Sequence, residues 1–271
     1  MTPPPARKRR RTSSKTSTWS IPQLEEWGLS RFQQRLLAVI ASVAGVLVAA
    51  VVLTFVIGSM GNDFVPERAT AAAISTQPRP DAYKGWVSPK LFAPIAQSKA
   101  DPTPLTLKDV FAEKVLKEGR ITLKLAGTKL DADCSAAIWG QALTDRLVQA
   151  GCTQAVRGVY AAADGRHVAQ YTLLNLRDTA SADALVQSLT TMHRGGWARP
   201  LESDRARFPA GGHTEASGHA MGHYVGLVWI GRADGAEPGA RDDFVSLSLA
   251  VRGAEKAVFR RVVAAGSGTA P

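Results

Sequence analysis

The chain has 271 residues, two cysteines and a formal net charge of +10. Its length allows one globular domain together with tails. The charge is uneven, because residues 1–35 hold eight lysines and arginines against two glutamates, a net +6. Only +4 is left for the rest of the chain, which is ordinary for a soluble domain and excludes charge as an argument for nucleic-acid binding.

The basic segment, residues 1–35, begins with a stretch rich in proline, arginine and serine, and this composition predicts disorder. Its run Arg7–Arg11 resembles a nucleic-acid-binding patch. Beside an apolar segment, a topogenic cluster that touches anionic lipid headgroups explains the run better. Ser20 and Gln23 have the spacing of a capping box, so a short helix is expected to follow and to lie in the membrane interface.

The stretch Leu36–Gly58 contains no charged residue and predicts a transmembrane helix. At about 1.5 Å rise per residue it reaches roughly 34 Å, enough to cross a hydrocarbon core of about 30 Å. The run is longer than the apolar core of a cleaved signal peptide, so we interpret it as an uncleaved signal anchor. Positive charge beside a span stays in the cytoplasm, which predicts an N-terminus inside and residues 59–271 outside.

Residues 59–104 are rich in proline and alanine, which predicts an extended stalk between the membrane and the domain. Five large apolar residues interrupt this stalk. They are expected to pack back on the edge of the domain, and docking of a partner is the alternative. These residues are Tyr83, Trp86, Leu91, Phe92 and Ile95.

An outer domain is predicted over residues 105–271. Its first half is expected to contain a helix from Thr106 to Gly119, a strand around Leu123 and a helix over residues 136–149. Two strands, Ala155–Ala162 and His167–Leu176, are expected to follow and to be joined by a turn at Asp164 and Gly165. Its second half is expected to begin with a helix capped by Ser181 and a long loop rich in glycine and histidine. A strand Tyr224–Gly231, a turn at Asp234 and Gly235 and a return strand Phe244–Val251 are expected to follow. The last predicted element is a helix, Ala254–Ala264.

Each half of this domain therefore carries a helix followed by a hairpin, which suggests an internal pseudo-repeat. Two such units would pair into an antiparallel sheet with helices packed on one face. The predicted fold class is α+β, preceded by the transmembrane helix. The pairing order of the two halves stays open.

The two cysteines, Cys134 and Cys152, flank the predicted helix over residues 136–149. In an oxidising compartment such a pair normally forms a disulfide. A continuous helix of that length would separate the two Cα atoms by about 21 Å, whereas a disulfide requires less than about 7 Å. Either the helix breaks near Gly140 or the cysteines do not bond to each other, and the sequence leaves both alternatives open.

Three histidines, His213, His219 and His223, are the weak candidates for a metal site. His219 and His223 have a spacing that places two imidazoles on one face of a helix. The metallopeptidase motif needs a glutamate directly after the first histidine, and Ala220 stands there instead. The segment is also rich in glycine, so a polar loop is expected, with no metal, no cofactor and no catalytic residues.

A resemblance covers roughly residues 85–260. The runs DCSAAIWGQALTDRLVQAGCTQAVRGVYAAADGRHVAQYTLLNL and GHYVGLVWIGRADG, behind a basic tail, one anchor and a stalk, resemble a group of uncharacterised actinobacterial membrane-anchored proteins. The resemblance implies a single-pass protein of the cell envelope with an extracytoplasmic domain. It implies no activity and no functional residues.

The sequence contains no nucleophile elbow and no glycine-rich phosphate loop between a strand and a helix. We therefore expect a non-enzymatic, membrane-anchored module that binds or senses an envelope protein or ligand. One alternative is a cell-envelope hydrolase or metal-dependent enzyme that uses the loop from His213 to His223. Another is a small transmembrane regulator that signals through residues 1–35. The ligand, the partner and the oligomeric state cannot be read from the sequence.

Overall fold

The computed structural model describes residues 36, 39–50, 52 and 77–267. The chain divides into two units, Met1–Arg68 and Ala69–Pro271. In the first unit the described residues are helical and their side chains are exposed. No helix built from the described residues is long and apolar enough to cross a membrane. The predicted tail, residues 1–35, the first part of the predicted stalk and parts of the predicted span Leu36–Gly58 lie outside the described residues.

The second unit contains nine strands, five α-helices and three short 3₁₀ helices in the described residues. The strands are β1 (Ala82–Trp86), β2 (Val115–Glu118), β3 (Ile121–Asp131), β4 (Ile138–Trp139), β5 (Gln154–Ala162), β6 (His167–Asn175), β7 (Trp197–Ala198), β8 (Thr214–Met221) and β9 (Tyr224–Arg232). The helices are η3 (Lys90–Ile95), α4 (Leu107–Val110), η4 (Cys134–Ala137), α5 (Gln141–Gln149), α6 (Thr179–Met192), α7 (Phe244–Val251), η5 (Arg252–Glu255) and α8 (Lys256–Ser267).

Seven of the strands form one sheet in the order β1-β8-β9-β6-β5-β3-β2. All neighbours are antiparallel except β1, which runs parallel to β8 and places Ala82 level with Glu215. The sheet is therefore mixed, where the sequence predicts an antiparallel one. Because β1 lies in residues predicted to be stalk, the folded unit begins before Leu105.

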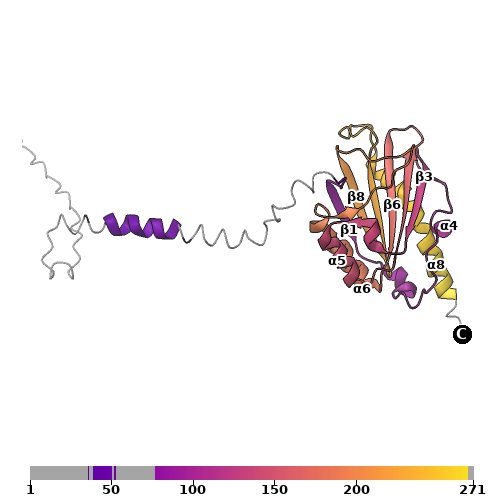
Figure 1. The fold of residues 1–271 in the computed structure, drawn as a ribbon, viewed down its shortest axis with the longest axis horizontal. Helices are drawn as coiled ribbons and strands as arrows, with labels where there is room; N and C mark the ends of the chain where they lie inside the picture. Colours follow the sequence, from indigo (N-terminus) through magenta and orange to yellow (C-terminus); the bar gives the residue numbers. More distant parts are fainter. Residues whose placement is uncertain (1–35, 37–38, 51, 53–76, 268–271) are drawn as a thin grey trace, which may run out of the picture. The chain divides into compact units, whose positions relative to one another are not determined.

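Helices cover both faces of this sheet, which corrects the prediction that they pack on one face only. Helices α5 and α6 lie on one side, and α4, α7 and α8 lie on the other, as the labels of Figure 1 show for α4, α5, α6 and α8. Each side has its own cluster of buried apolar side chains. In the central strands β6 and β9 nearly every residue is buried, whichever face of the sheet its side chain lies on. Both faces of the sheet are therefore covered.

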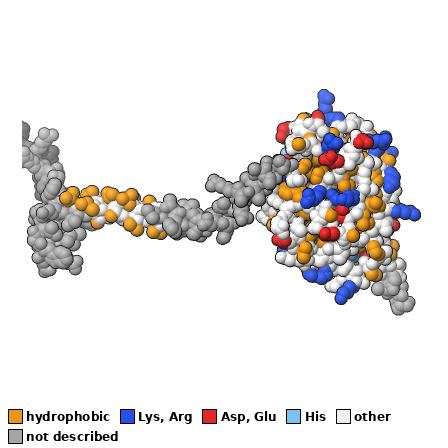
Figure 2. Space-filling view, in the orientation of Figure 1, with side chains coloured by type: hydrophobic (Ala, Val, Ile, Leu, Met, Phe, Trp, Pro, Cys, Tyr) orange, Lys and Arg blue, Asp and Glu red, His pale blue; other side chains and the backbone are white. Residues whose placement is uncertain are grey.

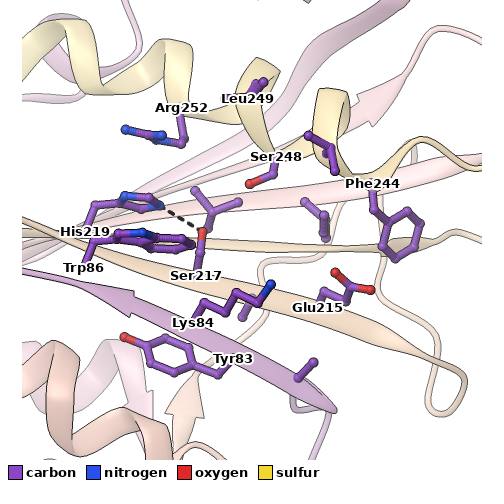
Figure 3. Close-up of a pocket in the computed structure, with 15 residues that line it drawn as sticks. Tyr83, Lys84, Trp86, Glu215, Ser217, His219, Phe244, Ser248, Leu249 and Arg252 are labelled. Carbon is purple, nitrogen blue, oxygen red and sulfur yellow. Dashed lines mark hydrogen bonds between the residues drawn. The ribbon is translucent and has the colours of Figure 1, made fainter.

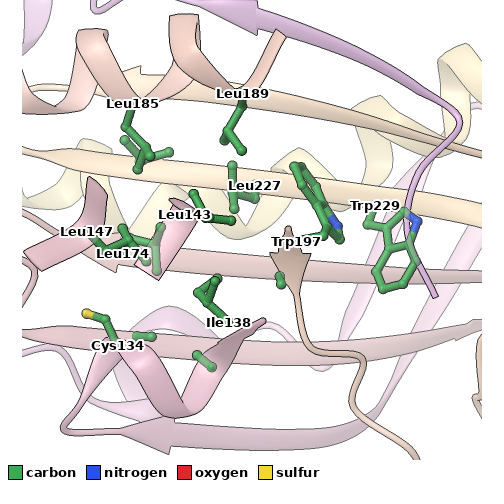
Figure 4. Close-up of a cluster of buried hydrophobic side chains, with 14 of the residues drawn as sticks. Cys134, Ile138, Leu143, Leu147, Leu174, Leu185, Leu189, Trp197, Leu227 and Trp229 are labelled. Atoms are coloured by element: carbon green, nitrogen blue, oxygen red, sulfur yellow. The ribbon is translucent and has the colours of Figure 1, made fainter. Parts of the chain in front are cut away.

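The core on the α5 and α6 side is drawn in Figure 4. Leu185 and Leu189 of α6 pack there with Trp197 of β7 and Trp229 of β9, and all four are at most 1% exposed. Fully burying side chains of this size stabilises a fold by about 1.5–3 kcal/mol each. This layer fixes α6 over the β8 and β1 side of the sheet.

The predicted helix over residues 136–149 is interrupted. The chain instead forms η4, the short strand β4 and then α5, with the break at Gly140. Gly140 has a φ of +96°, and a Cβ there would lie 2.3 Å from the carbonyl oxygen of Gly195, so only glycine fits. The break brings the cysteines together, and Cys134 and Cys152 form a disulfide with their Cα atoms 6.1 Å apart.

Two further element predictions are wrong. The helix predicted from Thr106 to Gly119 ends after one turn at Val110, and β2 follows, although Thr106 does cap the helix by accepting from the N–H of Asp109. The strand predicted at Phe244–Val251 is helix α7, capped by Asp243. In α7 the buried side chains Phe244, Leu247, Ala250 and Val251 lie on one side of the helix, the side that packs on the sheet.

The helix-plus-hairpin units are present, but the second hairpin differs from the prediction. Helix α5 precedes the hairpin β5–β6, which turns at Asp164 and Gly165 as predicted. Helix α6 precedes the hairpin β8–β9, which turns at Gly222 and His223 instead of at Asp234 and Gly235. Strands β6 and β9 of the two hairpins pair at the centre of the sheet.

The surface of the folded unit carries both signs of charge. On the face in view in Figure 2, lysine and arginine side chains are interspersed with acidic ones, and apolar side chains lie among them.

Candidate functional site

A groove lies on the α7 side of the sheet, between helix α7 and the strands β1 and β8 (Figure 3). Its volume is about 320 Å³, at the lower end of the range for small-molecule sites. Its lining is mostly apolar, with a few polar groups that converge from β1, β8, α7 and η5. The lining includes Lys84, Trp86, Ser217, His219, Leu249 and Arg252.

The groove exists because the two faces of this sheet edge are covered unequally. On the far face, α6 packs closely on β1, where the hydroxyl of Tyr83 donates to the carbonyl oxygen of Val186 at 3.0 Å. On the near face, α7 packs mainly on β2, β3, β6 and β9. The near face of β1 and β8 is thus left without a covering helix, and α7 forms a wall beside it.

An aromatic stack closes one end of the groove. The ring of Trp86 lies parallel to that of His219, with centroids 4.7 Å apart and an angle of 6° between the planes. Trp86 is 48% exposed, whereas His219 is 7% exposed and its Nε2 lies 3.0 Å from Oγ of Ser217. Burial, assisted by the charge of Arg252, lowers the pKa of His219 to about 3, so the ring is neutral at physiological pH. The stack presents a fixed, half-exposed indole to the groove.

A buried carboxylate holds an arginine at the groove wall. Nε and Nη2 of Arg252 donate to the two carboxylate oxygens of Glu255 at 2.9 and 3.0 Å. Glu255 is only 3% exposed, and burial raises its pKa while the guanidinium opposes that shift. This two-point contact orients the guanidinium and leaves its Nη1 uncommitted within the described residues, so the groove has a preorganised cation.

The opposite end of the groove carries Phe244 and an acidic residue. Oε1 of Glu215 lies 3.1 Å from Nε2 of His213. The ring of His213 stacks on that of Phe244, with the centroids 6.3 Å apart. Lys84 extends from β1 across the floor (Figure 3), and its side chain makes no hydrogen bond or ion pair with any residue in the described ranges. The groove therefore offers an aromatic end, a mixed polar floor and an apolar helical wall.

The three histidines of the predicted candidate cluster do not converge. They belong to strand β8 or its ends, instead of the polar loop that the sequence predicts. His213 contacts Glu215, His219 contacts Ser217 and Trp86, and Nδ1 of His223 lies 2.8 Å from the carbonyl oxygen of Ile95. Among residues 77–267 no three histidines, cysteines or acidic residues come together as a metal site.

Oγ of Ser217 and Nε2 of His219 lie 3.0 Å apart, which is the distance expected between a catalytic nucleophile and its general base. A general base is effective when its pKa lies near the working pH. The pKa of His219 is about 3, and its ring is stacked on Trp86 and buried, so it is a weak base with little room to move. The arrangement favours binding over proton transfer.

The sequence indicates only part of this site. It predicts Trp86 as an apolar residue of the stalk, and no motif distinguishes Lys84 or Arg252. Alternation was the available signal: Ala82, Lys84 and Trp86 occupy alternate positions, as do Glu215, Ser217 and His219. Two such runs predict two strands that present their polar side chains on one face.

Comparison of the chain with protein-family models, with curated proteins and with solved structures finds no match.

Proposed function

We propose that this protein is a membrane-anchored, extracytoplasmic binding module, and that the groove between α7 and strands β1 and β8 is its ligand site. The observation that carries the proposal is the half-exposed indole of Trp86, held flat by its stack on His219 at the end of an apolar groove. Fixed aromatic side chains supply large contact areas at a low cost in conformational entropy. The wall adds Leu249, which is 46% exposed although it is apolar.

A binding role, not a catalytic one, fits the chemistry of this groove. A hydrolytic centre combines a nucleophile, a base of suitable pKa and a group that orients the base. Ser217 and His219 supply the first two positions, but burial lowers the pKa of His219 to about 3. The oriented guanidinium of Arg252 and the unpaired amine of Lys84 are groups that recognise a ligand without reacting with it.

The anchor is part of the same proposal. It is supported by the uncharged stretch Leu36–Gly58, by the net +6 that precedes it and by the exposed apolar side chains of its described helical residues, such as Val46 at 70% exposure. The disulfide between Cys134 and Cys152 supports an oxidising compartment for the folded unit.

Topology provides the first test. We expect a reporter enzyme that is active only in the cytoplasm to be silent when it is fused after Pro271, because the net positive charge before the span retains the N-terminus inside. The same reporter fused before residue 36 should be active, which controls for expression. An active fusion after Pro271 would contradict both the orientation and the compartment.

Ligand screening provides the second test. Full-length protein in detergent would be heated with a library of small molecules and short peptides, and the unfolding temperature measured. A ligand at a hundred times its Kd stabilises by about 2.7 kcal/mol, which corresponds to a rise of roughly 5–10 °C for a unit of this size. We expect such ligands to lose their effect on Trp86→Ala and to keep it on Val148→Ala.

Val148 is the matched control because it is an apolar residue, 73% exposed, on helix α5 at the opposite face of the sheet. Ligands that stabilise both variants equally would place binding elsewhere. A library with no stabilising member would count against the binding role itself.

A further inference from the structure

Strand β1 forms an open edge of the main sheet beside the groove. No strand pairs with its outer side in the part of the chain that the structure describes. Four of its five residues are exposed, and the fifth, Tyr83, is half-buried by α6. An exposed strand edge presents a row of backbone donors and acceptors to any chain that can align with it.

The pairing of β8 shows which backbone groups of β1 point outward. Strand β8 turns into β9 through two residues, so Met221 and the odd-numbered residues before it exchange hydrogen bonds with β9. The even-numbered residues face β1, as Thr214 does, whose N–H donates to Asp81 and whose carbonyl accepts from it.

When two residues lie opposite each other in a parallel pair of strands, only one of them directs its N–H and C=O groups toward the other strand. Ala82 stands opposite Glu215 and Lys84 opposite Ser217, and these two residues of β8 bond to β9. The groups that bond to β8 therefore belong to Ala82, Lys84 and Trp86. It follows that Tyr83 and Gly85 direct their N–H and C=O groups away from the sheet.

The side chains beside this edge define what an added strand would meet. On the groove face lie Trp86 and Lys84, spaced by two residues, so they are about 7 Å apart along the strand. Lys84 is exposed, and its side chain has no hydrogen-bond or ion-pair partner within the described residues. Val87, directly after β1, is apolar and 48% exposed. A residue placed opposite Lys84 would gain most from a negative charge, and one opposite Trp86 from an apolar side chain.

A second copy of this chain fits the edge poorly. Antiparallel pairing of β1 with itself over its whole length would place Lys84 directly opposite Lys84 of the other copy. Like charges directly opposite each other destabilise a strand pair. The charge of the edge therefore favours a different chain with an acidic residue at that position.

We propose that the ligand of the groove is an extended acidic peptide segment that adds a strand to β1, with an acidic side chain opposite Lys84 and an apolar one opposite Trp86. This inference rests on the function proposed above and names its partner. The peptide backbone exchanges hydrogen bonds with Tyr83 and Gly85, and its alternate side chains extend the floor of the groove.

The test uses the peptide Ac-Thr-Val-Ala-Glu-Ala-Val-Thr-NH₂ with a fluorophore and full-length protein in detergent. In antiparallel alignment its glutamate lies opposite Lys84, its first valine opposite Trp86 and its two alanines opposite Gly85 and Tyr83. We expect N-methylation of either alanine to abolish binding, because those N–H groups point at β1. N-methylation of the glutamate should leave the affinity within about twofold, because that N–H points away.

Charge exchange gives the second arm. Lys84→Glu should weaken the peptide about tenfold, and a peptide with lysine in place of its glutamate should regain that loss on the variant. Lys117→Glu is the matched control, since Lys117 is an exposed lysine on β2, the other edge strand, and should leave binding unchanged.

The outcomes separate this inference from the function it rests on. Binding that depends on Trp86 and Lys84 but ignores the methylated alanines would overturn strand addition and leave the groove as a ligand site. Absence of peptide binding, with small molecules still stabilising the protein through Trp86, would do the same. A dimer of the protein that Lys84→Glu alters would show self-pairing and overturn the choice of partner.

Discussion

Replacing Cys134 with serine is expected to lower the free energy of unfolding by about 2–4 kcal/mol. The disulfide to Cys152 closes a loop with a sequence separation of 18 residues, and without it the unfolded chain gains conformational freedom. Cys134 is also 4% exposed within the core beneath α5, so serine would bury a hydroxyl in place of sulfur. Both effects act in the same direction.

Urea titration followed by tryptophan fluorescence measures this loss. Cys152→Ser should cost a similar amount, and the double variant should cost little more than either single one, because one bond is lost in all three. Two free thiols in the purified native protein, detected by mass spectrometry under non-reducing conditions, would contradict the bond and remove the reason for the expected loss.

The disulfide also shows what local sequence patterns can and cannot predict. Trp139, Leu143 and Leu147 recur at four-residue spacing, which predicts one helix over residues 136–149. The observed break at Gly140 depends on the approach of Gly195 and Gly196, which are more than fifty residues away in the chain. Local periodicity contains no information on that contact. The two cysteines indicated only that either a continuous helix or their bond had to be absent, because the two are incompatible.

The strands of the two hairpins were predictable to different degrees. Strands β5 and β6 are rich in β-branched and aromatic residues and turn at Asp164 and Gly165, a strong local signal. Strand β8 contains glycine, alanine, serine and histidine, which have low strand propensity, and it forms because β9 and β1 pair with it on both sides. Its Gly218 is needed where the hydroxyl of Tyr83 approaches, since a Cβ there would lie 2.1 Å from it.

Helix α7 illustrates the opposite error. Its sequence FVSLSLAV alternates apolar and polar residues over part of its length, which predicts a strand. Phe244, Leu247 and Val251 also have helical spacing, and packing on the sheet selects that alternative. Since α7 is one wall of the groove, this error concealed one side of the site. The rest of the groove was hidden because β1 comes from the proline-rich residues predicted to be stalk.

Replacing Asp131 with alanine is expected to lower the free energy of unfolding by about 3–5 kcal/mol, because it leaves a buried charge without its partner. Arg157 donates to Oδ2 of Asp131 through Nη2 at 2.6 Å and through Nε at 3.2 Å. The side chains of Arg157 and Asp131 are only 3% and 6% exposed. The third donor of the guanidinium, Nη1, is bonded to the carbonyl oxygen of Arg199, so the arginine cannot leave without breaking that contact too.

Lys129→Met is the matched control for this ion pair. Lys129 contacts the same carboxylate at 3.1 Å, but its side chain is 54% exposed, so its removal should cost less than about 1 kcal/mol. The double variant Asp131→Leu with Arg157→Met should recover most of the loss of Asp131→Ala, since apolar side chains of similar size remove the need to bury a charge. Urea titration of the four proteins gives the comparison. Equal losses for Asp131→Ala and Lys129→Met would mean that solvent reaches Arg157, and the β3–β5 ladder would then be held by its backbone and apolar contacts alone.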